Sequence, residues 1–540
     1  MTITIPGLAT STKTPGVYMN VILGGAPASP GTQAIKIMLM GNKIGTAVSG
    51  SAPTIALPAG TIAVATPIAL SSSDDAATYF GLGSEVHIMS RAVFAQYPNA
   101  TVYGVAVAEG GGAYASVVCT FATTASASYT IRVRACGEVI DVPVTTSDTA
   151  TTIATNVCAA VNAVTWLPYY AQWSSSVDDR LVAFTAKCNG PRGNELTVLL
   201  SFVSSSGTET PITTSSTSSG AGTTGIMSGG TVSGNIYVFS GGTTQDSFTN
   251  ALSAMTPVRY NRIVGACTDA TNIGRISTHI SSQSSVTSQK REQGVCATLA
   301  SSGTATTLAT GVNAARMQIA WHYNSLVPAC MIAAQVCAAR VIGDSFAGGF
   351  LPGEASDPDA NLSGIQLATI PMQNSVDDQP TQTEIESALN NGLTVLGAST
   401  ARPGYAVMPM SITSLSLING LQNYAVLFTG YVTVCDYVAD GEQSALGVRY
   451  AGFKLGSNDA NGEPPKAPLV TTPQQIRASV LLDLKGYESQ GIIRDVDANA
   501  SLLVVEASGV TPGRVDMDIP VEPTPWLTIL AGNVRQIPSV

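Results

Sequence analysis

Three histidines, His87, His279 and His322, are the side chains of this chain best suited to carrying protons near neutral pH. Each lies inside an amphipathic or apolar segment, which favours a structural role. The nearest match to a nucleophile elbow, Gly343 to Ala347 (GDSFA), lacks the final glycine of G-x-S-x-G and follows a predicted helix instead of a strand. The sequence therefore predicts no catalytic constellation and no enzymatic activity.

Cofactor and metal motifs are also incomplete. Gly81-Leu82-Gly83 does not continue to G-x-G-x-x-G, and the sequence has no P-loop. The segment 357–368 begins like a calcium loop, but Leu362 replaces the turn glycine and Ala368 replaces the bidentate acid. Nine cysteines are scattered without a CxxC pair or a Cys/His cluster of zinc spacing. We expect no cofactor and no metal.

Composition limits the partners of this 540-residue chain. Lys and Arg number 25 against 35 Asp and Glu, so there is no basic footprint for nucleic acid. Charged residues make up only 11 % of the chain, against about 25 % in an average soluble domain. The longest apolar stretch, 326–342, contains Pro328, Gln335 and Arg340 and is too short for a membrane helix. Met1 to Ala9 lacks a secretory pattern, so we expect cytosolic synthesis and mostly reduced thiols.

The elements that would position these residues begin with a βαβ pattern. Residues 33–41 alternate as a buried strand, 85–97 repeat apolar residues at helical spacing, and 101–108 form a second strand. After residue 236, strands at 262–267, 294–299 and 317–323 alternate with helices. This rhythm predicts a doubly wound or flavodoxin-like α/β layer.

Between these parts lies a β-rich insertion, bordered by glycines at 110–112 and 228–234. The predicted organisation is a multidomain α/β fold interrupted by a protruding, mainly β domain, with an α+β C-terminal subdomain and extended terminal arms. The boundaries are 1–25 for the N-terminal arm, 26–110 and 236–352 for the α/β domain, 113–232 for the insertion, 353–510 for the C-terminal subdomain and 511–540 for the C-terminal arm.

This combination resembles the tail-sheath proteins of contractile-tailed bacteriophages. The resemblance rests on Thr14-Pro-Gly-Val-Tyr18, the strand ending at Asn42, and the segments 72–83 and 99–106. Segments 131–162, 183–199 and 226–230 are similar to the protruding domain of that family and its exit. The order and spacing of the segments carry the resemblance, and the region after Asn423 departs from it.

The resemblance implies a structural subunit that polymerises around an inner tube and contracts to drive the tube through the host envelope during genome delivery. It implies stacked hexameric rings or helical strands of this chain, contacts with the tail tube protein, baseplate and tail terminator, and a place in the virion after assembly in the host cytoplasm. It implies no direct nucleic-acid contact and no membrane insertion.

The terminal arms are expected to add strands to the sheets of neighbouring subunits. At the C-terminus, the alternation in 515–521 and the apolar run at 526–531 both favour this pairing. The predicted contact residues are Pro15, Gly16, Val17, Tyr18, Val515, Met517, Ile519, Val521, Trp526, Leu527 and Ile529.

A particle that leaves a reducing cytosol could form disulfides between adjoining subunits. The candidates are Cys119, Cys136 and Cys188, which we expect to be more accessible than Cys330 or Cys337. Alternatively, most of the cysteines are small buried apolar residues.

Two other classes of function remain open. A receptor-binding or adhesin-like surface protein would explain the Ser/Thr/Gly-rich insertion. A degenerate α/β enzyme would explain the α/β layer, and would need a cleft with a perturbed titratable group.

Overall fold

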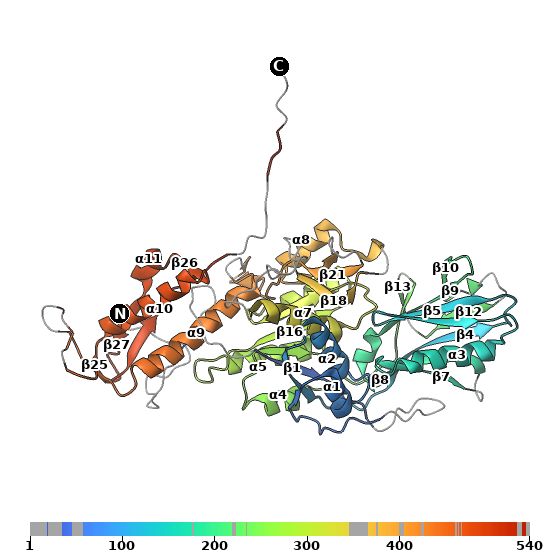
Figure 1. Ribbon diagram of the computed structural model, residues 1–540, viewed down its shortest axis with the longest axis horizontal. Helices are drawn as coiled ribbons and strands as arrows, with labels where there is room; N and C mark the ends of the chain where they lie inside the picture. Colours follow the sequence, from blue (N-terminus) through green and yellow to red (C-terminus); the bar gives the residue numbers. More distant parts are fainter. Residues whose placement is uncertain are drawn as a thin grey trace, which may run out of the picture. The chain divides into compact units, whose positions relative to one another are not determined.

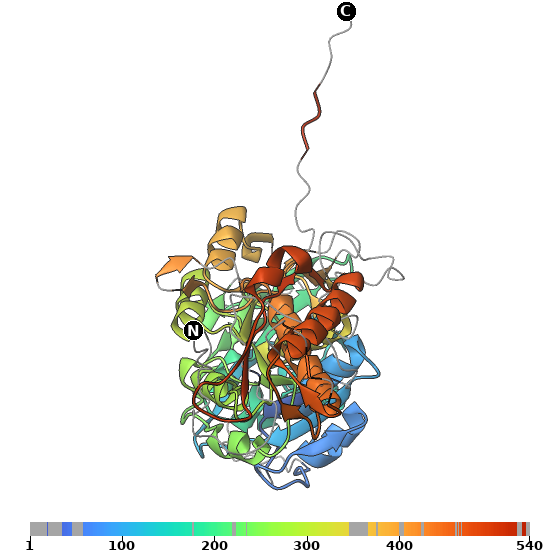
Figure 2. The same cartoon turned by 90° about the vertical axis from the view of Figure 1, so that its left-hand side faces the viewer.

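The computed structural model forms two compact units. Residues 33–342 and 366–429 belong to the larger one, here called the α/β unit, and the C-terminal unit is built mainly from residues 430–540. Figures 1 and 2 colour the C-terminal unit orange to red. The structure describes residues 19, 35–45, 58–174, 178–215, 217–218, 223–229, 231–233, 235–344, 365–373, 376–398, 404–418, 420–422, 426–458, 462, 464–465, 467–525 and 532–535.

A seven-stranded sheet organises the α/β unit, in the order β19-β17-β16-β15-β1-β3-β2. Six of its strands are parallel, and β2 joins β3 antiparallel at one edge. Along the chain, the first five parallel strands give the order 2-1-3-4-5 typical of flavodoxin-like sheets. The strands are β1 (Lys36–Gly41), β2 (Ile68–Leu70), β3 (Thr101–Ala106), β15 (Arg262–Gly265), β16 (Gln293–Thr298), β17 (Met317–Trp321) and β19 (Thr394–Val395).

Capped helices connect these strands. Ser72, Ser84 and Asp269 accept backbone N–H groups at the starts of three helices, as N-cap residues do. Ile273, Ile276 and Ile280 of α5 recur at helical spacing and pack against the sheet. The helices are α1 (Ser73–Phe80), α2 (Glu85–Gln96), α4 (Thr249–Met255), α5 (Ala270–Gln283), α6 (Ser302–Val312), α7 (Ala329–Asp344) and α8 (Gln382–Asn390). No helix among the described residues is long and apolar enough to cross a membrane.

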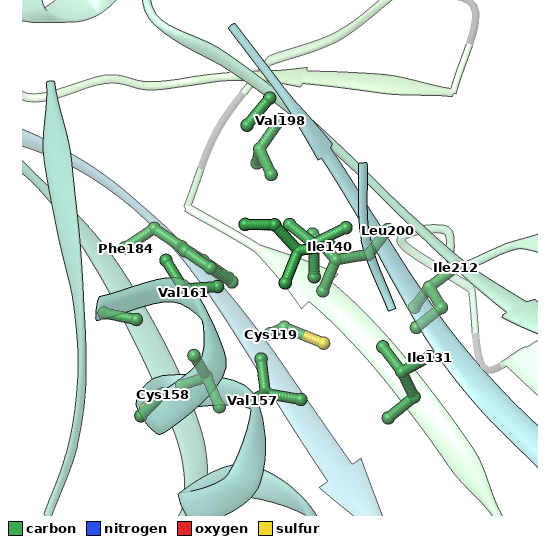
Figure 3. Packing of buried hydrophobic residues seen from close by; sticks show 14 of the residues in the cluster. Cys119, Ile131, Ile140, Val157, Cys158, Val161, Phe184, Val198, Leu200 and Ile212 are labelled. Carbon is green, nitrogen blue, oxygen red and sulfur yellow. The ribbon is translucent and has the colours of Figure 1, made fainter. Parts of the chain in front are cut away.

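The insertion has a hydrophobic core of its own between antiparallel sheets and one helix (Figure 3). One sheet has the order β13-β14-β9-β5-β6 with β10 on β9, and the other β11-β12-β4-β8-β7. Residues on β4 and β5 alternate between buried and half-buried, as expected for strands with one face on a core. The elements are β4 (Tyr114–Ala122), β5 (Tyr129–Ala135), β6 (Glu138–Val144), α3 (Ala150–Ala163), β7 (Tyr169–Ser174), β8 (Asp178–Asn189), the 3-10 helix η1 (Pro191–Glu195), β9 (Thr197–Val203), β10 (Glu209–Pro211), β11 (Thr217–Ser218), β12 (Thr224–Ser228), β13 (Thr231–Ser233) and β14 (Ile236–Val238).

The predicted C-terminal boundary differs from the structure. Residues 366–429, assigned above to the C-terminal subdomain, belong to the α/β unit. The reason is that β19 continues the parallel sheet by pairing with β17. This part also contains β18 (Ile365–Pro371), η2 (Val376–Asp378), β20 (Gly397–Ala398), β21 (Tyr405–Met408), β22 (Leu417–Ile418) and β23 (Leu421–Gln422).

The C-terminal unit is built on two helices, α9 (Thr429–Arg449) and α10 (Pro473–Ser489). Thr472 and Gln475 form a capping box at the start of α10, where Pro473 occupies the first turn. The smaller elements are β24 (Lys454–Leu455), β25 (Val470–Thr471), β26 (Ile493–Arg494), α11 (Val496–Asn499), η3 (Ala500–Leu502), β27 (Val504–Ala507), β28 (Val515–Asp518) and β29 (Glu522–Pro523).

The segment predicted to be a C-terminal arm is partly a component of this unit. β28 pairs antiparallel with β27, and β29 pairs with β26. Val515, Met517 and Ile519 pack against the core of the unit, and Val521 is part of that core. The alternation in 515–518 is therefore accounted for by a hairpin within the chain, and the pairing of residues 515–521 with another subunit stays a prediction.

Candidate functional site: a buried ion-pair network at the sheet's switch point

The order in which the chain adds strands to the parallel sheet reverses between β1 and β15. From β1 the chain proceeds to β3 on one side, and after the insertion it returns to β15 on the other. Open α/β sheets bind ligands in the crevice at this position, beyond the carboxyl ends of the strands. In this chain Gly41-Asn42 and Gly265-Ala266 lie at those ends.

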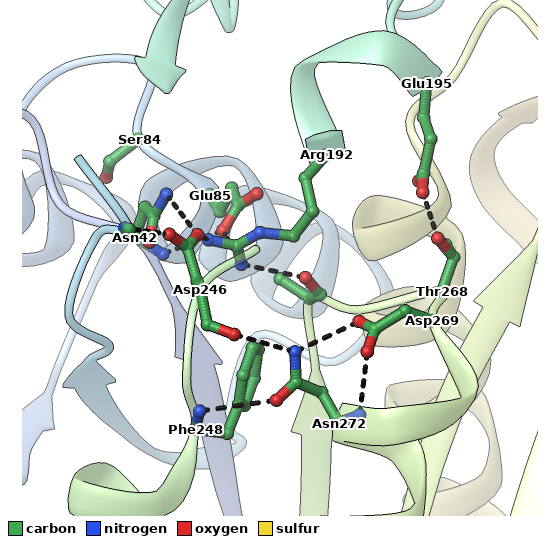
Figure 4. A network of polar contacts seen from close by, with 12 residues as sticks. Asn42, Ser84, Glu85, Arg192, Glu195, Asp246, Phe248, Thr268, Asp269 and Asn272 are labelled. Carbon is green, nitrogen blue, oxygen red and sulfur yellow. Dashed lines mark hydrogen bonds and ion pairs between the residues drawn. The ribbon is translucent and has the colours of Figure 1, made fainter. Parts of the chain in front are cut away.

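The insertion places Arg192 at this position, from the short helix η1 (Figure 4). The Nη1 group donates to Glu85 Oε2 at 2.7 Å and to the carbonyl of Ala266 at 2.9 Å. The Nη2 group donates to Asp246. The Arg192 side chain is only 6 % exposed. One guanidinium thus connects the insertion to α2, to the end of β15 and to the segment that re-enters the sheet.

The backbone holds both carboxylates in place. The N–H of Asn42 donates to Glu85 Oε2 at 2.8 Å, and its side-chain amide donates to Asp246 at 3.2 Å. The N–H of Gly110, at the entrance to the insertion, also donates to Asp246. Position 41 has no room for a side chain, because a Cβ there would lie 2.8 Å from Glu85 Cβ. A buried carboxylate needs several hydrogen-bond donors to offset the water that it loses.

A second layer of polar contacts extends the network to α5. The Asn272 side chain donates to the carbonyl of Asp246 at 3.0 Å and to Asp269 at 3.1 Å. Asp269 in turn accepts the N–H of Asn272 at 2.8 Å as the cap of the helix. Glu195, also on η1, accepts a hydrogen bond from Thr268 after β15. The insertion therefore contacts the loop after β15 at two residues, Ala266 and Thr268.

Burial dominates the electrostatics of the site. Burial raises the pKa of Glu85, although Arg192 opposes the rise. Burial also raises the pKa of Glu195 to about 7, and burial together with Asp246 raises that of Glu109 to about 7. The Arg192 cation is thus surrounded by acids that are costly to ionise without it.

A second buried cation of the insertion, Lys187 on β8, reaches the loop between α1 and α2. Its Nζ donates to the carbonyls of Leu82 at 3.1 Å and Thr165 at 2.7 Å. Burial lowers the pKa of Lys187 to about 8. Lys187 and Arg192 lie five positions apart, so one strand and the turn after it supply both anchors.

Chemically, this arrangement is suited to coupling two domains. The cavity beside Arg192 has a volume of about 30 Å³ and is lined in part by Cys188, Cys267 and Cys330. That is room for a water molecule and not for a substrate. In the part of the chain that the structure describes, no three His, Cys, Asp or Glu side chains gather as a metal ion would require.

The histidines singled out from the sequence occupy separate structural positions. His87 Nδ1 accepts the N–H of Gly83 at 2.9 Å, and burial lowers its pKa to about 4. The His322 ring lies between the carbonyl of Pro371 and the Gln373 amide, at 3.1 and 3.2 Å, and burial lowers its pKa to about 4 as well. His279 lies 3.5 Å from Glu292.

Some of the other predicted site residues lie outside the described residues. These are Pro15, Gly16, Val17, Tyr18, Trp526, Leu527, Ile529, Ser345 and the segment 357–364. Of the described C-terminal residues, Val515 and Met517 lie in the β27–β28 hairpin, and Ile519 and Val521 pack with the core of the C-terminal unit.

The predicted accessibility of the cysteines is wrong for two of the three candidates. Cys119 is 0 % exposed in the core of the insertion and Cys136 is 4 % exposed. Cys188 is half-buried, as is Cys330, and burial raises the thiol pKa of both. None of the nine cysteines, which all lie among the described residues, forms a disulfide. Cys119 and Cys136 face inward because each lies on the core side of its strand or turn.

Sequence reasoning missed Arg192. It lies within the segment 183–199 used for the family resemblance, between the glycines of Gly190-Pro-Arg-Gly193. An arginine between turn glycines in a chain with so few charges was the available signal, but its acidic partners lie 107 and 54 positions away in the sequence.

No family model and no curated protein matches the sequence. The solved sheath tail protein of Desulfitobacterium hafniense is 12 % identical, with 95 % of this chain and 97 % of that chain covered and a TM-score of 0.45. The sheath tail protein of Listeria innocua is also 12 % identical, with 92 % of this chain and 93 % of that chain covered and a TM-score of 0.44. A chain of the anti-feeding prophage baseplate is 10 % identical over 56 % of this chain and 76 % of its own, with a TM-score of 0.36. This chain is thus similar to sheath tail proteins.

Proposed function

We propose that this chain is the structural subunit of a contractile phage tail sheath. It polymerises around an inner tube, and the polymer contracts to drive the tube through the host envelope during genome delivery. Its partners are further copies of itself, the tail tube protein, the baseplate and the tail terminator. It is a component of the virion and has no catalytic role.

One observation supports the proposal most: Arg192 of the insertion occupies the crevice where flavodoxin-like sheets bind ligands. A degenerate enzyme would keep that crevice open to a substrate. A force-bearing subunit instead needs its inserted domain to remain fixed on the α/β layer when it rotates as a rigid body in the assembly. Two buried cations and their hydrogen bonds supply such a connection.

Composition supports the same proposal. Only 11 % of the residues are charged, so a large surface can be buried between copies without leaving many charges unpaired. The terminal arms remain part of the proposal, with the C-terminal arm now beginning after Pro525, beyond the last residues packed on the C-terminal unit.

Negative-stain microscopy of the purified full-length protein tests the proposal. Tubes or stacked rings of uniform diameter are the expected result. A stable monomer at high concentration would contradict it, and a monomer that binds a glycan or a cell-surface receptor would favour the adhesin-like alternative.

A further inference from the structure

A carboxyl group interrupts the apolar face of helix α9. Val434, Val438, Glu442 and Leu446 recur every fourth residue and are all buried. The three apolar residues of this set pack in one core with Ile476, Val480 and Leu484 of α10. Residues at this spacing share one side of a helix. Glu442 therefore lies between α9 and α10, where the pattern calls for an apolar residue.

The Glu442 side chain is isolated from water and from hydrogen-bond donors. Its exposed fraction is 0 %, and among the described residues neither carboxyl oxygen has a hydrogen-bond partner. An ionised carboxylate in such a place is costly, whereas the protonated acid is tolerated.

The charged and titratable neighbours do not relieve this cost. Asp483 and Tyr487 face Glu442 from α10, and Arg449 acts on it from α9. The Arg449 guanidinium is engaged by Asp483 in two contacts, of 2.7 and 3.0 Å. Tyr437 of α9 in turn faces Tyr487 of α10. Asp483 adds a negative charge next to Glu442, and the nearby cation is bound to Asp483.

We propose that Glu442 makes the α9–α10 pair a proton-dependent switch, in which the uncharged carboxyl lets the two helices pack and the carboxylate loosens them. Burial, followed by Asp483, raises the pKa of Glu442 from 4.5 to about 8, against the opposing effect of Arg449. Because the pKa of Glu442 is raised in the folded state, the packing of α9 on α10 keeps its full stability below pH 4.5. This stability is lost as the pH rises through about 8.

The size of the effect follows from the linkage of one proton to folding. Between about pH 5 and pH 8, the equilibrium constant for opening the helix pair rises about tenfold per pH unit, and it levels off above. Glu442 acts within one subunit, so this behaviour does not depend on the assembly that the chain forms.

Amide hydrogen exchange of the full-length protein tests the switch. Exchange in peptides of α9 and α10 is measured from pH 5 to pH 9 and corrected for the intrinsic pH dependence of exchange. We expect the opening constant to rise steeply with pH in the unaltered protein and to lose this rise in Glu442→Gln. Glu386→Gln, at an exposed position of α8, is the matched control and should keep the rise.

A second variant guards against a Gln side chain that disrupts packing. Glu442→Leu completes the apolar face, so it should stay folded and also lose the pH dependence. A rise that persists in either variant of Glu442, or an unaltered protein whose opening constant does not change between pH 5 and pH 8, would overturn the proposal.

Discussion

Arg192 of the insertion forms an ion pair with Asp246, which has no exposed side-chain surface and lies where the chain leaves the insertion for the α/β layer. The two residues are 54 positions apart in the sequence. The inserted domain is thus held by a charge at its own exit point, and its glycine borders do not make it independent of the layer beneath.

Replacing Arg192 with Ala should destabilise the α/β unit by about 3–5 kcal/mol, because the change leaves Glu85 and Asp246 buried without a cation. Arg192→Lys should be intermediate, since an ammonium cannot reproduce the forked contacts to two carboxylates and a carbonyl. Urea unfolding followed by circular dichroism measures both. Arg180→Ala, which removes an exposed arginine paired with Asp178, is the control and should leave the midpoint unchanged. Equal stability of Arg192→Ala and the control would mean that the network is not needed for folding.

Removal of the insertion should give a soluble α/β unit only if Glu85 and Asp246 are also replaced by uncharged residues. Gly110 and Gly112 lie against Thr243 and Thr244, so a short Gly/Ser bridge from Gly112 to Thr243 can close the gap. The shortened chain should be poorly soluble with Glu85 and Asp246 intact. Combining the deletion with Glu85→Gln and Asp246→Asn should recover soluble α/β unit, because the amides need no cation. Soluble yield and size-exclusion chromatography are the measurements, and equal yields with and without the amide substitutions would contradict this role of Arg192.

The contrast between the sheet and the site shows what the sequence could predict. The strands and helices of the α/β layer follow local signals: apolar runs such as 36–41, and the helical repeat and Ser84 cap of α2. The boundaries of 353–510 and the partners of 515–521 depend on which strands pair across long stretches of chain. Periodicity shows that Met517 has a buried face and does not show whose core covers it. The partners of Arg192 are non-local for the same reason.

Deleting residues 526–540 should leave the C-terminal unit folded and prevent polymerisation, if this tail is the arm of a sheath subunit. Deleting from Arg514 instead removes β28, β29 and the buried Val521, and should unfold the unit. Amide hydrogen exchange in α10 reports folding, and negative-stain microscopy reports assembly. Tubes of normal length from the shorter deletion would contradict the role of the arm, whatever the longer deletion does.

The burial of the cysteines predicts slow thiol chemistry in the native protein. Cys119 and Cys136 should not react with Ellman's reagent until the chain unfolds, whereas the half-buried Cys188 and Cys330 should react first. Mass spectrometry after brief alkylation identifies the modified sites, and the urea-unfolded chain, which should release all nine thiols, is the control. Electrophoresis of assembled particles without reductant should give a monomer band. A ladder that contains Cys119 would contradict the burial described here.

Gly83 is the position where a single added carbon should most disturb the junction. Its φ of +82° favours glycine, and a Cβ would lie 2.2 Å from the Leu167 carbonyl oxygen and 2.6 Å from Lys187 Nζ. Gly111 is a matched control, because its φ is +70° and nothing lies within 4 Å of an added Cβ. Gly111→Ala should cost about 1 kcal/mol for the strained backbone alone. Gly83→Ala should cost about 1–3 kcal/mol more, because Lys187 must leave its carbonyl partners or the loop must move. Urea unfolding of the two variants side by side gives the difference. Equal losses would contradict a role of the Lys187 contact in holding the insertion at this edge of the sheet.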